Sequence, residues 1–321
     1  MRRLWQSMMI SLARRDGLTR FVQSWRATSG LTRRFVAGRT VETAAQRARQ
    51  LFDDKGLRAS LFYLGEYVTD PGVIAQTLTQ KIAASAALVQ AGLDVHVSVD
   101  STQIGQMIDT GVTRENAARI VRGFKNNQQG GTVDAARVNV LMFDMEDASV
   151  IDDTIALHDG FASQGDRVAL TLQAYLKRTE VDLQRQIARG AKVRLVKGAF
   201  IAGDDIAFTA RADIKANYRR LVERMFSPAA RATGFYPIIA THDERIQAYA
   251  LEKARLGGWG PDEFEFEMLL GVRSNVAERL AADGWRVRLY TPFGVDWWPY
   301  AIRRIGENPA NAVLLARSLV S

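Results

Sequence analysis

The residues of this chain best suited to chemistry are polar and charged side chains in or directly after short apolar runs. Arg194 and Lys197 stand three residues apart in the run KVRLVKGA (192–199). A charge is costly to bury there without a partner, and side chains three apart on a strand point to opposite faces. One of the two could line a site while the other reaches a carboxylate; two purely structural ion pairs are the alternative. Similar positions after other runs are held by Asp100, Asp144, Gln173, Thr241, His242 and Tyr290.

A second group of candidates forms the pattern Tyr-x-x-Arg-Arg, made by Tyr300, Arg303 and Arg304. On a helix, residues three and four apart share one face. Two guanidinium groups on one face make a clamp for a small carboxylate. A solvated basic face is the alternative, but the neighbouring Trp297 and Trp298 favour a covered site.

Eight apolar or β-branched runs, each followed by a helix-like segment, must position these residues. The runs cover residues 61–68, 95–100, 138–146, 168–174, 192–199, 236–241, 263–269 and 287–292. The alternation predicts an α/β fold, a closed (β/α)8 TIM-like barrel, with an open doubly wound sheet as the alternative. No Gly-x-Gly-x-x-Gly pattern follows the first run, so a Rossmann nucleotide site has no support. Catalytic side chains of a barrel project from the carboxyl ends of its strands, where the candidates lie.

The chain divides into two predicted regions. Residues 1–56 are helix-like and rich in arginine, and we expect an N-terminal helical arm that covers one side or end of the barrel. Residues 57–321 form the catalytic barrel. Leu4, Trp5 and Met8 belong to an apolar helical face of the arm, which packs on the barrel or, alternatively, rests on a membrane surface.

Composition excludes several classes of site. The chain has no cysteine and three histidines, which excludes disulfides, iron–sulfur clusters and cysteine nucleophiles and argues against a metal site. The net charge of +8 fits an arginine-rich surface, an anionic ligand or an anionic membrane. No run of five basic residues occurs, so we expect no nucleic-acid partner. No stretch approaches the ~20 apolar residues of a membrane span, and no signal peptide is apparent, which predicts a cytoplasmic protein.

Several segments, taken in order, resemble the proline dehydrogenase family. They are FYLGE (62–66), FDMED (143–147), LQAYLKRTEVDL (172–183), VRLVKGAF (193–200), ATHD (240–243), EFEMLLGV (265–272), VRLYTPFG (287–294) and WWPYAIRRIGENPAN (297–311). The resemblance implies a distorted (β/α)8 barrel that holds FAD non-covalently. It further implies oxidation of proline to Δ1-pyrroline-5-carboxylate, with electrons passed to a membrane quinone.

The resemblance also implies roles for individual residues. The expected FAD contacts are Gln173, Arg194, Lys197, Gly198, Ala199, Thr241 and His242. Arg194 should lie near flavin N5, where a cation stabilises the charge left by hydride transfer, and Asp144 should support the site from beneath. The expected substrate contacts are Asp100, Leu270, Tyr290, Tyr300, Arg303, Arg304 and Glu307, with the paired arginines on the substrate carboxylate and Glu307 orienting one of them.

Departures from the family pattern leave alternatives open. Asp100 stands where family members carry a lysine near the substrate, and two acids placed together raise a pKa or attract a cation. The same flavin chemistry on a related cyclic or N-substituted amino acid is therefore one alternative. Asn308 replaces a common arginine, and Phe200 replaces a tyrosine. A Schiff-base lyase that uses Lys197 is a second alternative, and a non-catalytic basic protein that binds membranes or nucleic acid is a third.

Overall fold

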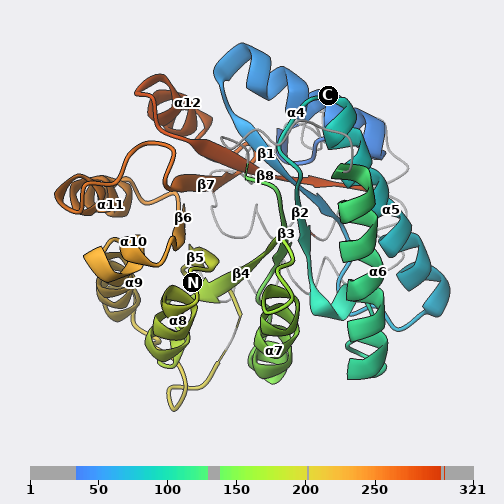
Figure 1. Ribbon diagram of the computed structural model, residues 1–321, viewed down its shortest axis with the longest axis horizontal. Helices are drawn as coiled ribbons and strands as arrows, with labels where there is room; N and C mark the ends of the chain where they lie inside the picture. Colours follow the sequence, from blue (N-terminus) through green and yellow to red (C-terminus); the bar gives the residue numbers. More distant parts are fainter. Residues whose placement is uncertain (1–33, 129–137, 201, 298–299, 301–321) are drawn as a thin grey trace, which may run out of the picture.

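The structure, a computed structural model, describes residues 34–128, 138–200, 202–297 and 300. Eight parallel strands follow one another around a closed barrel, and β8 pairs with β1 to complete it (Figure 1). The strands are β1 (Arg58–Tyr63), β2 (His96–Val99), β3 (Val140–Phe143), β4 (Val168–Gln173), β5 (Lys192–Val196), β6 (Tyr236–Ala240), β7 (Glu265–Leu269) and β8 (Val287–Phe293). The predicted TIM-like barrel is confirmed, and the open doubly wound sheet is wrong.

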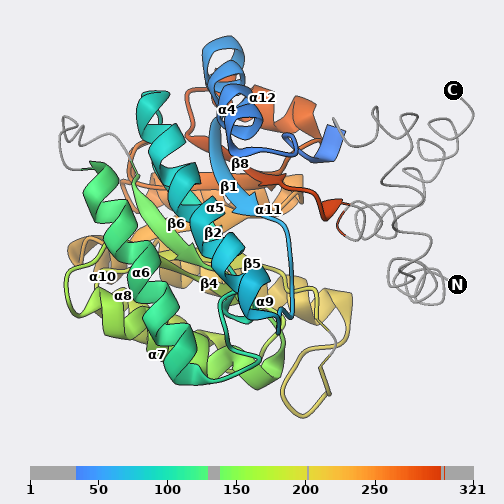
Figure 2. The same cartoon turned by 90° about the vertical axis from the view of Figure 1, so that its right-hand side faces the viewer.

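Helices surround the barrel and lie on its outer face (Figures 1 and 2). They are α4 (Val41–Lys55), α5 (Pro71–Gln90), α6 (Thr110–Gln128), α7 (Ile151–Ala162), α8 (Thr179–Ala188), α9 (Arg211–Met225), α10 (Pro228–Ala232), α11 (Glu244–Leu256) and α12 (Ser274–Ala282), with 3-10 turns η2 (Ser101–Gln103) and η3 (Ala148–Val150). Within the described ranges, no helix combines the length and the apolar character needed to cross a lipid bilayer.

Helix α4 belongs to the region predicted as an N-terminal arm. It packs against β1, β8, α5 and α12, and so covers the β8–β1 side of the barrel (Figure 1). Thr40 caps its first turn and Gly56 ends it in the left-handed conformation, at φ 65°. Residues 1–33, and with them the predicted apolar face of the arm, lie outside the described residues.

The local sequence determines where helix α5 begins and which of its faces packs against the strands. Asp70 caps it, because its carboxylate accepts hydrogen bonds from the backbone N–H groups of Gly72 and Val73 at 2.7 and 3.0 Å. Pro71 holds the first helical position, where its missing N–H costs nothing. One face of the helix packs on β1 and β2. Its buried residues are Ile74, Thr77, Leu78, Lys81, Ala84, Ser85 and Leu88, of which Lys81 alone carries a charge.

The two faces of the sheet have different characters. Side chains alternate along a strand, so Leu61 and Val97 enter the apolar core between the sheet and the helices. Their neighbours on β1 and β2 face the barrel interior, where Ser60 contacts His96. Much of that interior is polar, and this polarity requires a network of partners.

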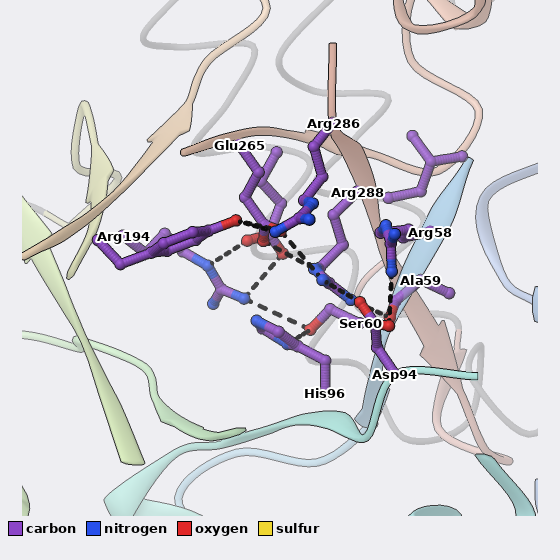
Figure 3. A network of polar contacts seen from close by, with 12 residues as sticks. Arg58, Ala59, Ser60, Asp94, His96, Arg194, Glu265, Arg286 and Arg288 are labelled. Carbon is purple, nitrogen blue, oxygen red and sulfur yellow. Dashed lines mark hydrogen bonds and ion pairs between the residues drawn. The ribbon is translucent and has the colours of Figure 1, made fainter. Parts of the chain in front are cut away.

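A chain of buried ion pairs lies in the barrel interior near the amino ends of the strands (Figure 3). Arg288 is fully buried and contacts Glu265 at 2.7 Å and Asp94 at 2.8 Å. His96, Glu265 and Glu267 lie close enough together to offer ligands to a metal ion. Both carboxylates are already held by arginines, however, so we interpret this cluster as structural ion pairing.

The first strand begins and ends earlier than predicted, at residues 58–63 instead of 61–68. Arg58 can begin it inside the protein because its guanidinium contacts Asp94 at 2.6 Å. The chain leaves the sheet after Tyr63, where the side-chain amide of Gln103 donates to the carbonyls of Tyr63 and Gly65 at 2.8 and 2.6 Å. These two hydrogen bonds take the place of strand pairing.

Candidate active site

A cavity of about 850 Å³ opens at the carboxyl ends of the strands, and residues in or directly after all eight strands contribute to its lining. Such a position is where barrel enzymes place their catalytic side chains. Eleven of the predicted site residues line it: Asp100, Asp144, Gln173, Arg194, Lys197, Gly198, Ala199, Thr241, His242, Tyr290 and Tyr300. Strand ends far apart in the sequence therefore converge as expected.

Arg194 lies at the base of this cavity and is held on several sides. Its guanidinium makes two hydrogen bonds of 2.7 Å to Glu267, pairs with Asp144, and contacts the Ser98 hydroxyl at 3.2 Å. Burial alone would lower the pKa of Arg194, but Glu267 and Asp144 outweigh it and raise the pKa above its ordinary value. The group is thus a fixed cation whose orientation is set by two carboxylates.

Asp144 joins Arg194 to the opposite wall of the cavity. It accepts hydrogen bonds from Thr171 at 3.1 Å and from the Tyr290 hydroxyl at 2.9 Å. Burial, followed by Asp144 and Asp100, raises the pKa of Tyr290 well above its ordinary range, so this phenol remains a donor. The Tyr290 ring lies 5.2 Å from that of Phe62, and together the two rings form an aromatic wall.

Cationic side chains gather at the β5–β7 end of the cavity. Lys197 and Lys215 both contact Asp243, at 3.1 and 2.9 Å. Burial would raise the pKa of Asp243, but the hydrogen bonds from Lys215 and Lys197 lower it to about 2. Arg245 and Arg273 also line this end. The two lysines carry more positive charge than Asp243 neutralises, which suits an anionic ligand such as a phosphate.

Two positions at this end are fixed by backbone geometry. Gly198 has φ +97°, and a Cβ added there would lie 2.1 Å from the Tyr175 ring, so only glycine fits. His242 uses its Nε2 to accept a hydrogen bond of 2.9 Å from the backbone N–H of Leu269. Thr241 is buried, and its hydroxyl accepts from the backbone N–H of Asp243 at 3.2 Å.

Carboxyl groups gather at the β1–β3 end. Glu66, Asp100, Asp144 and Glu146 all line the cavity. Burial raises the pKa of Glu146 to about 7, although hydrogen bonds from Thr102 and Ser101 oppose the shift. Burial, followed by Glu146 and Asp144, raises the pKa of Asp100 well above its ordinary value. The cavity is therefore polarised: the charged residues at the β1–β3 end are acids, whereas at the β5–β7 end cations outnumber acids.

Some predicted residues fall elsewhere. Leu270 lies in the hydrophobic core, and the cavity lining contains Leu269 in its place. The correction follows from strand alternation, because Leu269 is two residues from the inward-facing Glu267. Arg303, Arg304 and Glu307 lie outside the described residues. Arg194 and Lys197 were expected to point to opposite faces of one strand, but both line the same cavity. The reason is that β5 ends at Val196, so strand alternation does not extend to Lys197.

Sequence reasoning missed several residues of this site. Glu267 was visible as a charge in the apolar run EFEFEML, where a buried carboxylate needs an ion-pair partner such as Arg194. Lys81 was visible as the lone charge on the apolar face of α5. Glu66 was visible as a charge within the apolar run predicted for residues 61–68, whereas Lys215 gave no signal because it lies on a helix of mostly polar residues.

The fold and the cavity define a (β/α)8-barrel protein with its site at the carboxyl ends of the strands. The family model for proline dehydrogenase matches residues 44–317. The chain is 34% identical over 297 residues to proline dehydrogenase of Deinococcus radiodurans, covering 90% of each chain. It is 29% identical over 308 residues to proline dehydrogenase 2 of Bacillus subtilis (strain 168), covering 95% of each.

Solved structures agree on the fold. Proline utilization A from Bdellovibrio bacteriovorus, inactivated by N-propargylglycine, superposes with a TM-score of 0.76 at 19% identity, over 88% of this chain and 33% of that one. The protein of the same name from Corynebacterium freiburgense gives 0.72 at 22% identity, over 98% of this chain and 34% of that one. This chain thus spans about a third of those larger proteins. It belongs to the proline dehydrogenase family and is an oxidoreductase.

Proposed function

We propose that this protein oxidises L-proline to Δ1-pyrroline-5-carboxylate by hydride transfer to flavin N5 of a non-covalently held FAD, with electrons passed on to a quinone. The observation that carries the proposal is the polarised cavity in a chain of this family. Carboxyl groups at the β1–β3 end suit an amine, and lysines at the β5–β7 end suit phosphates. Arg194 lies between them.

The residues present fit FAD. When bound, the cofactor would supply the hydride acceptor. Lys197 and Lys215 would hold its phosphates, Gln173 and Arg194 would contact its ring system, and Gly198 leaves room beside them. The side-chain amide of Gln173 is oriented by a 2.8 Å hydrogen bond to the Glu146 carbonyl. Ala199, Thr241 and His242 complete the proposed set.

Arg194 can contact a flavin only by exchanging a partner. Its N–H groups are already directed at Glu267, Asp144 and Ser98. The contact to the neutral Ser98 hydroxyl, at 3.2 Å, is the weakest of the three and the one we expect to be replaced. The two carboxylates would keep the guanidinium in place during that exchange.

The substrate would lie between the aromatic wall and the acidic end. Phe62, Tyr290 and Leu269 would pack on its ring and exclude water, and Tyr300 would lie near its carboxylate. Arg303 and Arg304, with Glu307 orienting one of them, would bind that carboxylate, as expected from the sequence.

The alternative functions differ in their support. Asp100 favours a test of related cyclic or N-substituted amino acids, because it adds an acid where the substrate is expected. Lys197 is paired with Asp243, whereas a Schiff-base lysine must be an uncharged nucleophile, so the lyase receives no support from the geometry. The quinone acceptor, the peripheral contact with a membrane and the cytoplasmic location remain predictions.

Steady-state kinetics with a soluble quinone analogue tests the proposal. We expect the flavin-loaded protein to oxidise proline more efficiently than hydroxyproline, pipecolate or N-methylproline. Arg194→Met should lose most of kcat, while Arg231→Met, which removes an exposed arginine paired with Glu263, should retain it. A protein that binds FAD but oxidises none of these compounds would refute the proposed reaction. A preference for another of these compounds would refute only the assignment of proline as the substrate.

A further inference from the structure

Asp100 is a buried acid of the cavity whose side chain takes part in a capping box with Gln103 at the start of η2. It follows β2, lines the cavity and is 6% exposed. Asp144 is paired with Arg194, and Glu146 accepts hydrogen bonds from Ser101 and Thr102 at 3.1 and 3.0 Å. Among the described residues, Asp100 forms no ion pair within 4.0 Å. A buried carboxyl at a cavity wall without such a partner is available to a ligand.

Lys81, on helix α5, contacts the strand that Asp100 follows. Its ammonium is fully buried, donates a 2.7 Å hydrogen bond to the Ser98 carbonyl and lies 5.0 Å from the centre of the Phe62 ring. Helix α5 packs on β1 and β2, so Lys81 approaches β2 from the surrounding helix layer, and the Phe62 ring beside it lines the cavity. Ser98 lies on β2, two residues before Asp100 in the chain.

A buried ammonium needs negative charge nearby to remain charged. Burial lowers the pKa of Lys81 to about 8, and Asp100 leads the groups that oppose this shift, before Asp144 and Glu146. In return, Lys81 is the group that opposes the raised pKa of Asp100. Each of the two groups therefore favours the charged form of the other. The other ionisable groups facing Asp100 are Glu66, Glu146, Asp144 and Tyr290, all acidic, with Arg194 beyond Asp144.

We propose that Asp100 binds the protonated nitrogen of a cyclic secondary amine and takes its proton, and that Lys81 is a positioning residue that keeps Asp100 able to ionise. The inference rests on the proposed function. In the step, an N–H bond of the ammonium breaks, an O–H bond forms on Asp100, and the electron pair stays on the nitrogen. That lone pair is what the neighbouring ring carbon needs to release a hydride to the FAD of the proposed function.

The proposal defines a class of substrate. A secondary or tertiary ring ammonium carries a proton for Asp100 to accept, whereas a quaternary nitrogen carries none. N,N-dimethylproline should therefore not be oxidised, although its charge suits the acidic end of the cavity. The binding of an amine should also weaken as the pH falls, because the protonated form of Asp100 cannot pair with an ammonium.

Measuring the Kd of ligands that cannot react, with the FAD-loaded protein, tests amine binding by Asp100 independently of turnover. The probes are 5,5-dimethylproline, which has no hydrogen on ring carbon 5 to transfer, and tetrahydrofuran-2-carboxylate, which has an oxygen in place of the nitrogen. Asp100→Asn should raise the Kd of the amine about tenfold or more, as expected for a lost charge-assisted hydrogen bond. The Kd of the ether should stay within about twofold, because it offers Asp100 no proton. Equal changes for both probes, or none for either, would overturn the proposal.

Two further variants test the pairing with Lys81. Asp100→Glu keeps a carboxyl and should retain the pH dependence of amine binding that Asp100→Asn loses. Lys81→Met removes a cation and should move the midpoint of that dependence to higher pH by about one unit. Lys125→Met, on the outer surface of α6, should leave the midpoint unchanged.

The outcomes remain distinguishable. An unchanged midpoint in folded Lys81→Met would refute the role of Lys81, and an Asp100→Glu variant without pH dependence would refute that of Asp100. Should Lys81→Met fail to fold, the Asp100 variants and the two probes still decide the proposal. A wild-type protein that oxidises no amine would refute the proposed function. If the wild-type protein oxidises proline normally but Asp100→Asn changes the Kd of the amine and the ether equally, only this inference is refuted.

Discussion

Replacing Glu267 by glutamine should destabilise the barrel by leaving Arg194 short of one buried counter-charge. Arg194 and Glu267 are 3% and 2% exposed and form two hydrogen bonds of 2.7 Å. Removal of one partner from a buried pair costs about 3–5 kcal/mol. Because Arg194 keeps Asp144, we expect a loss of about 3 kcal/mol in the free energy of unfolding. With an unfolding entropy of about 0.7 kcal/mol/K for a chain of this length, Tm should fall by about 4 °C.

Scanning calorimetry in saturating FAD measures this loss. The matched control is Glu263→Gln, which removes one partner of a pair with Arg231 whose side chains are 42% and 46% exposed. Exposed pairs contribute about 0–1 kcal/mol, so the control should change Tm by about 1 °C or less. If both variants unfold at the same temperature, Glu267 does not hold Arg194 as described, and the account of a fixed guanidinium at the cavity base is refuted.

Three further changes have defined outcomes. Gly198→Ala should destabilise the protein more than Gly165→Ala in urea titrations, because both glycines have positive φ but only the first meets a ring; equal losses would contradict this. The raised pKa of Glu146, about 7, means that the folded state keeps this proton at pH values where the unfolded chain has lost it; the stability gained is present at low pH and lost as the pH rises through about 7. Glu146→Gln should flatten that fall in unfolding free energy, and an unchanged slope would oppose it. Lys197→Met should weaken FAD binding about tenfold or more in fluorescence titrations, whereas the exposed Lys177→Met should not; equal effects would exclude the phosphate role.

Strand alternation and the order of elements made the fold predictable. Eight short apolar runs separated by capped helices leave few arrangements other than a closed parallel barrel. The same geometry predicted that Asp100, Gln173 and Tyr290 meet, because the carboxyl ends of all strands share one end of a barrel. Their convergence needed no knowledge of side-chain conformations.

The remaining features depend on three-dimensional contacts. The family resemblance assigned Leu270 to the substrate site, and the one-residue shift to Leu269 becomes visible only against an inward-facing residue such as Glu267. The pairing of Lys81 with β2 depends on how deeply α5 packs, which periodicity does not specify. The shared contact of Lys197 and Lys215 with Asp243 likewise joins residues from three elements.

Anaerobic addition of proline to the flavin-loaded protein tests the central claim most directly. If the polarised cavity holds FAD at its basic end and an amine at its acidic end, the visible absorption band of the flavin should bleach as proline is added, with one proline consumed per flavin. A protein that takes up no FAD, or whose band persists with proline and with every related cyclic amino acid, would contradict the account.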